Sequence, residues 1–170
     1  MSWLRALAGA ALVVVALVLQ VSLFPYVAWH GIVPNLCLLV VVGAALTRGP
    51  QFAMTLGFVA GVLLDLAPPA DHVAGRWAVA LVLVGYVAGR VRQDVRPSAV
   101  GVVATVAASS FLGTSVFALT GLLLGDLAVG VPGLLQVIGV AVVWDVLLTP
   151  FVLPLVMRVL DRLEPATATV

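Results

Sequence analysis

The sequence predicts an all-α integral membrane protein that forms one bundle of six transmembrane helices. Of the 170 residues, 64% are hydrophobic and 9% are charged, whereas soluble domains carry about 25% charged residues. The mean hydropathy is +1.27. Apolar runs cover almost the whole chain, so we expect no soluble domain beside the membrane domain.

Six segments have the composition of membrane-spanning helices, which need about 20 mostly apolar residues when they face lipid. We place these segments at residues 3–24, 33–46, 51–66, 73–89, 98–124 and 133–160. Together they are expected to form a single domain over residues 1–164. The last residues, 165–170, are expected to be a disordered tail.

The first three segments differ in how clearly they are bounded. The apolar run from Leu7 to Phe24 is longer than the hydrophobic region of a secretory signal, so it is predicted to be a retained helix. The second and third segments are short, and only Arg48-Gly49-Pro50 separates them. Pro50 suits the first turn of a helix. A re-entrant hairpin is therefore the competing topology for these two segments.

The last three segments carry features that affect packing. Gly85 and Gly89 in the fourth segment have a small-xxx-small spacing, which permits close helix contact but occurs often by chance. The fifth segment is an uninterrupted apolar run. In the sixth, Pro150 removes the backbone bond to the carbonyl of Val146 and predicts a kink.

The distribution of basic residues predicts the orientation, because arginines near helix ends are retained on the cytoplasmic side. With the N-terminus inside, seven of the eight arginines are cytoplasmic and only Arg76 is outside. Both termini are then cytoplasmic. Arg48 is interpreted as a topology anchor, with contact to lipid phosphate or to a partner as alternatives. The run from Arg90 to Arg96 suits anionic lipid headgroups or an acidic partner, and the alternative is that it only sets the topology.

The main candidate site is a stripe of Gly57, Gly61 and Asp65, which are four residues apart and share one helix face. A carboxylate in a spanning segment is costly, and the C-terminal end of a helix disfavours negative charge. Asp65 therefore needs a compensating partner. Arg76 is preferred as that partner, and the other polar residues near the outer side are Gln20, His30 and His72. The alternative is a hydrated Asp65 at the outer membrane interface.

Asp145 is a second candidate, placed deeper in the membrane and close to the predicted kink at Pro150. A local polar pocket is plausible there because a proline frees a backbone carbonyl. A proton relay would need another buried acid, and the sequence offers no clear one at the depth of Asp145.

Several function classes are poorly supported by the sequence. The net charge of +1 gives no reason to expect nucleic acid as a partner. The single cysteine, Cys37, excludes an intramolecular disulfide and a thiol metal cluster. His30 and His72 fall in different predicted loops, and no metal-ligand spacing, serine elbow or phosphate loop is present. We therefore expect no enzyme, no metal and no cofactor.

Short motifs recur in a fixed order along the first half of the chain. They are Pro34-Asn35-Leu36, Arg48-Gly49-Pro50, Gly57-Phe58 with Gly61 and Asp65-Leu66, and Gly85-Tyr86 with Gly89-Arg90. In order and spacing, and with the six-helix hydropathy, this set resembles the rod shape-determining protein MreD family. The family supplies no catalytic residues, and Asp65 with its glycines is its most recognisable motif.

The resemblance implies a multi-pass protein of the bacterial cytoplasmic membrane. It implies a non-enzymatic scaffold or regulator of the cell-wall elongation (rod) complex that binds a bitopic MreC-like protein. Through that complex it would act with the MreB filament, RodA and a penicillin-binding synthase to control cell shape and peptidoglycan synthesis. The family is also similar to the six-helix substrate-binding subunits of energy-coupling-factor transporters. The alternative function is therefore a vitamin-type carrier subunit whose pocket holds Asp65.

Overall fold

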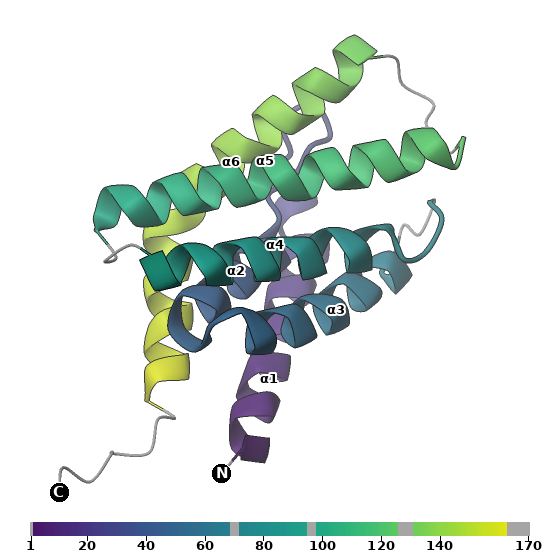
Figure 1. The fold of residues 1–170 in the computed structure, drawn as a ribbon. Coiled ribbons are helices and arrows are strands. Elements are labelled where there is room, and N and C mark those ends of the chain that lie inside the picture. Colours follow the sequence, from purple (N-terminus) through teal and green to yellow (C-terminus); the bar gives the residue numbers. More distant parts are fainter. Residues whose placement is uncertain (1, 69–71, 95–97, 126–130, 163–170) are drawn as a thin grey trace, which may run out of the picture.

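A computed structural model describes residues 2–68, 72–94, 98–125 and 131–162 of the chain. These residues form six α-helices and one short 3-10 helix (Figure 1). Their bounds are α1 Ser2–Ser22, η1 Phe24–Val27, α2 Leu36–Arg48, α3 Pro50–Leu66, α4 Arg76–Asp94, α5 Ala99–Leu123 and α6 Val131–Asp161. The six predicted helices are thus all present. The predicted tail at 165–170 lies outside the described residues.

Several helix boundaries differ from the prediction by a few residues. Helix α2 begins at Leu36 rather than at residue 33, because Asn35 is its N-cap and accepts a hydrogen bond from the amide of Leu38. Helix α4 continues to Asp94 rather than ending at residue 89. The arginine-rich segment that was expected to be a loop therefore begins as a further turn of α4.

Three of the helices are long and apolar enough to cross a membrane by length and composition. They are the helices at Trp3–Ser22, Ala99–Leu123 and Pro132–Asp161. The segments Leu36–Arg48 and Pro50–Leu66 are shorter apolar helices. The chain therefore has the composition and the helices of a membrane protein.

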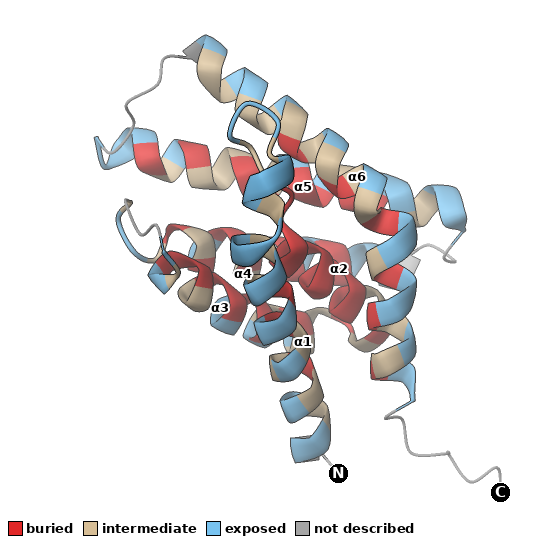
Figure 2. Ribbon diagram, turned by 180° about the vertical axis from the view of Figure 1, so that it is seen from behind, coloured by how far each residue is buried: buried red, intermediate tan, exposed pale blue. Residues whose placement is uncertain are grey.

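Helix α2 is the centre of the structure. It contacts each of the other five α-helices, and all its residues except Leu46 and Arg48 are buried. Figure 2 shows α2 in red inside the bundle, while α1 is largely exposed. A helix surrounded by protein does not have to match the thickness of the hydrocarbon layer. This explains how a helix of 13 residues can form the core of the domain.

The stripe on α3 brings its backbone against α4. A Cβ atom placed on Gly57 would lie 2.5 Å from the carbonyl oxygen of Leu81, and one placed on Gly61 would collide with the backbone of Ala78. No Cβ atom tolerates such distances to backbone atoms. The close helix contact expected from this glycine spacing is therefore present.

The glycines of α4 make the matching contact from the other side. A Cβ atom on Gly85 would lie 2.7 Å from the carbonyl group of Ala53, and one on Gly89 would lie 2.5 Å from the backbone of Pro50. Helices α3 and α4 lie side by side in Figure 1. The small-xxx-small spacing in α4, a weak signal in the sequence, is thus one half of a reciprocal antiparallel interface.

Helix α6 is bent (Figure 1), and it contains both Pro150 and Pro154. Each proline lacks the amide that would bond the carbonyl four residues earlier, so the helix can bend there. After the bend α6 packs on α2, where a Cβ atom on Gly43 would lie 2.7 Å from the side chain of Val156. The kink predicted from Pro150 is therefore present.

The α3–α4 interface leads to a first testable prediction. We expect Gly61→Ala to lower the free energy of unfolding by about 2 kcal/mol, because the added methyl group overpacks the contact with α4. The matched control is Gly139→Ala in α6, where nothing lies within 4 Å of an added Cβ atom. Thermal unfolding of the detergent-purified variants measures both effects, and equal losses in the two variants would contradict the interface.

Candidate functional site

The carboxylate of Asp65 binds the N-terminus of α4. Its Oδ2 accepts hydrogen bonds from the amides of Gly75 at 2.8 Å and Ala78 at 3.2 Å, and its Oδ1 accepts one from the amide of Trp77 at 3.1 Å. These are among the first amides of a helix, which have no partner within the helix itself. They also lie at the positive end of the helix dipole. Asp65 is therefore a cap that one helix supplies to the next.

This arrangement differs from both expectations for Asp65. The residue is only 3% exposed, so the alternative of a hydrated carboxylate is wrong. The carboxylate is held by the backbone of α4 rather than by the guanidinium of Arg76, which was the preferred partner. His72 lies beside it, with Nδ1 at 3.8 Å from Oδ1 of Asp65.

The guanidinium of Arg76 extends toward α5. Its Nη2 donates a hydrogen bond to the carbonyl of Phe117 at 2.8 Å, and its Cζ lies 3.9 Å from the centre of the Phe117 ring. The same ring stacks on Trp77 at 4.4 Å and meets the edge of His72 at 5.2 Å. Cation–π contact and a carbonyl bond together stabilise a buried arginine. Phe117 was not predicted from the sequence, since it is one aromatic residue in a long apolar run.

Asp145 makes a similar contact with the N-terminus of α2. It is fully buried, and its Oδ1 accepts a hydrogen bond from the amide of Asn35 at 2.8 Å. Its Oδ2 accepts one from the hydroxyl of Ser110 at 2.6 Å. The contact joins α6 and α5 to the beginning of α2. The polar pocket expected near Pro150 is thus a set of structural hydrogen bonds.

Gln20 also binds the start of α2. Its Oε1 accepts a hydrogen bond from the amide of Cys37 at 3.3 Å, while the side chain of Asn35 accepts one from the amide of Leu38 at 2.9 Å. The first amides of α2 therefore receive acceptors from α1, from α6 and from its own N-cap. Gln20 was considered for its depth near Asp65, but the structure brings it together with the Asn35 end of α2.

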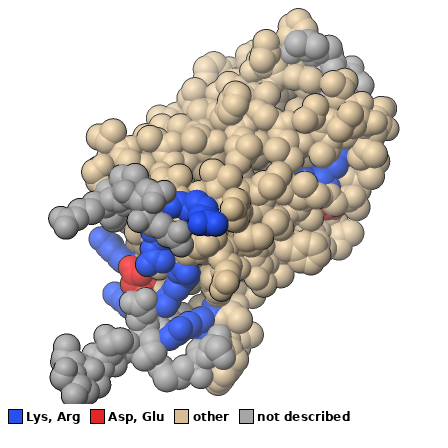
Figure 3. Space-filling view, in the orientation of Figure 1, with Lys and Arg blue, Asp and Glu red and all other residues tan. Residues whose placement is uncertain are grey.

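Arg48 binds the C-terminal end of α6. Its Nη2 donates a hydrogen bond to the carbonyl of Leu160 in the last turn of α6. A cation at the C-terminus of a helix is favourable because the free carbonyls there carry partial negative charge. Figure 3 shows that the described arginines gather mainly at one end of the molecule, with a separate basic patch toward the other end. Arg48 thus binds protein, at the C-terminal end of α6.

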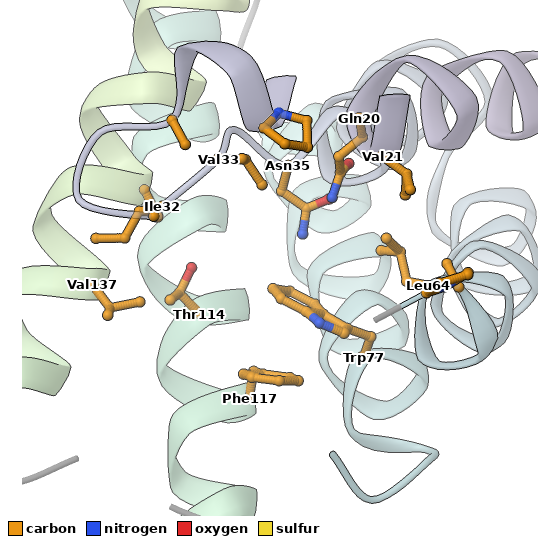
Figure 4. Close-up of a pocket in the computed structure, with 16 residues that line it drawn as sticks. Gln20, Val21, Ile32, Val33, Asn35, Leu64, Trp77, Thr114, Phe117 and Val137 are labelled. Atoms are coloured by element: carbon orange, nitrogen blue, oxygen red, sulfur yellow. The ribbon is translucent and has the colours of Figure 1, made fainter. Parts of the chain in front are cut away.

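A cavity of about 780 Å³ lies beside the start of α2 (Figure 4). Its lining includes Gln20 and Asn35 from the α2 contact and Trp77 and Phe117 from the aromatic stack. Asp65 is not among the described residues that line it. Within the described ranges, no group of three His, Cys, Asp or Glu side chains could hold a metal ion. The polar residues of the site are therefore arranged chiefly to hold helix ends.

The fold and the site define an all-helical membrane protein in which buried carboxylates fix the starts of neighbouring helices. The model of the rod shape-determining protein MreD family matches residues 2–159. The chain belongs to this family, and the family indicates a membrane component that determines rod shape. No curated protein and no solved structure gave a significant match.

The two carboxylates should respond differently to neutralisation. Within the described residues, the hydrogen bonds that Asp65 accepts all come from backbone amides. In Asp65→Asn, the new side-chain NH2 group would therefore face a backbone N–H donor in place of an acceptor. We expect a loss of about 1–3 kcal/mol in the free energy of unfolding. In Asp145→Asn, the oxygen can keep the bond from Asn35 and the new amide can donate to the hydroxyl of Ser110, which rotates freely.

Asp145→Asn should therefore be much less destabilising than Asp65→Asn. Asp145→Ala is the control, because it leaves the amide of Asn35 without its acceptor and should be strongly destabilised. Thermal unfolding in one detergent compares the three variants. Similar losses in both asparagine variants would contradict the assigned hydrogen bonds.

Proposed function

We propose that this chain is a non-enzymatic scaffold of the rod complex that binds an MreC-like bitopic protein and helps control peptidoglycan synthesis. The observation that carries the proposal is the family match over residues 2–159. The use of Asp65, Asp145 and Arg48 supports it, because each of these side chains binds the end of another helix. A scaffold needs such a rigid bundle, with its outer surface available to a partner.

We further propose that the bundle crosses the bacterial cytoplasmic membrane six times, with both termini inside. The gathering of arginines at one end supports this orientation (Figure 3). The turn between α2 and α3 lies at that same end. There Arg48 binds the last turn of α6, and a Cβ atom on Gly49 would lie 3.5 Å from the guanidinium of Arg92. This placement favours two full crossings over a re-entrant hairpin.

Cysteine labelling tests the topology. The native Cys37 is completely buried and should give little background. Tyr26→Cys, at a position that is 87% exposed, should react with a membrane-impermeant maleimide in intact cells. Gln51→Cys, at an exposed position beside the α2–α3 turn, should react only after the inner membrane is permeabilised. Labelling of Gln51→Cys in intact cells would refute the proposed orientation.

Co-purification tests the scaffold proposal. When the chain is expressed with the MreC protein of the same genome, we expect the two to elute together from detergent in a fixed ratio. An unrelated single-span protein with the same tag is the control. Asp65→Asn should reduce recovery of the complex only as far as it reduces the folded protein. Free elution of folded wild-type chain without MreC would contradict direct binding.

The cavity favours a second candidate function, the binding subunit of a vitamin-type transporter. Its volume of about 780 Å³ lies within the usual range of small-molecule sites. In that case, protein purified from rich medium should carry a stoichiometric water-soluble ligand. The position of Asp65 weighs against this function, because its carboxylate accepts hydrogen bonds from the backbone amides at the start of α4 and is not directed at a ligand.

A further inference from the structure

The cavity beside α2 contains an unsatisfied hydrogen-bond donor. Asn35 is only 7% exposed, and its Nδ2 has no hydrogen-bond partner among the described residues. The direction of the amide group is determined, because its oxygen accepts a hydrogen bond from the amide of Leu38. Figure 4 shows the nitrogen pointing into the cavity. A buried donor without a partner is costly, so an acceptor is expected at this point.

The rest of the cavity wall is mostly apolar. The indole of Trp77 and the side chains of Leu64, Phe117 and Val137 face it (Figure 4). None of the described residues that line it carries a formal charge. The buried part of a ligand is therefore uncharged and largely hydrocarbon, with a hydrogen-bond acceptor near Asn35.

A shallow pocket adjoins the cavity on the outer surface of the bundle. A shallow groove of about 350 Å³ between α1 and α3 shares Val21, Ala67 and Pro68 with the cavity lining. The groove continues along Leu17 and Val18, and Val18 is 54% exposed. An apolar groove that opens on the exposed face of a membrane helix suits a hydrocarbon chain better than a water-soluble molecule.

We propose that this cavity binds the acyl-ester region of a membrane glycerolipid. An ester carbonyl accepts a hydrogen bond from Nδ2 of Asn35, and the acyl chain extends through the groove between α1 and α3. This site goes beyond the scaffold function, since it makes one ordered lipid part of the folded domain. No covalent step is involved.

Lipid exchange on the unmodified chain tests the hydrogen bond. Delipidated protein is reloaded with a diacyl phosphatidylglycerol or with its dialkyl ether analogue, which lacks the carbonyl oxygens. Native mass spectrometry measures the bound fraction. We expect the ester lipid to bind about tenfold more tightly, because the ether leaves the buried donor of Asn35 poorly satisfied. Equal affinities would overturn the assigned contact.

A pair of matched variants locates the lipid. Val137→Phe fills the cavity from α6, whereas Val143→Phe makes the same change at a position of α6 that is 48% exposed and outside the cavity lining. We expect Val137→Phe to lower lipid retention at least tenfold and Val143→Phe to leave it unchanged, at equal thermal stability. If Val137→Phe is unstable, the ester–ether comparison on the wild-type chain decides.

Two results would overturn the proposal. Equal lipid retention by both phenylalanine variants would mean that the lipid binds elsewhere on the surface. Loss of MreC co-purification in Val137→Phe, with lipid retention unchanged, would mean that a segment of the partner fills the cavity instead. Because MreC binding by the wild-type chain is measured separately, failure of the lipid site leaves the scaffold proposal intact.

Discussion

The structure depends on one kind of interaction, a buried carboxylate that binds the free amides at the start of another helix. Burying a charge without a partner is very costly, and the first amides of a buried helix are costly for the same reason. Placing the two together lowers both costs. Asp65 does this between α3 and α4, and Asp145 does it between α6 and α2. The Asp65 contact also fixes the register in which Gly57 and Gly61 meet α4.

Much of the fold could be predicted from the sequence, because hydropathy and proline positions are local signals. Together with the four-residue spacing of Gly57 and Gly61, they predicted all six helices, the close contact of the α3 glycines and the kink in α6. The two buried carboxylates were also recognised, since charge is conspicuous in an apolar chain. The backbone amides that bind these carboxylates were not predicted. Every helix start offers backbone amides, whatever its residue types, so a sequence shows Arg76 as a possible partner but does not show the amides of Trp77 and Ala78.

Other parts of the site were missed because their meaning depends on a neighbour far away in the chain. Gly85 and Gly89 become informative only when α3 is known to lie opposite them. Ser110 was an ordinary hydroxyl in a helix until Asp145 was placed beside it. Asn35 stood out in the sequence only as part of the motif Pro34-Asn35-Leu36, and the structure makes it the N-cap of α2. That its amide nitrogen points into a cavity follows only from the three-dimensional arrangement.

The two carboxylate contacts also differ in when they can form. Asp65 and its three amide partners are separated by 10 to 13 residues, so α3 and α4 can satisfy each other as a hairpin soon after they are synthesised. Asn35 and Asp145 are 110 residues apart. The start of the central helix therefore lacks its carboxylate until the last helix has been made. Until α6 has been synthesised, the amide of Asn35 has to be satisfied by water or by another acceptor.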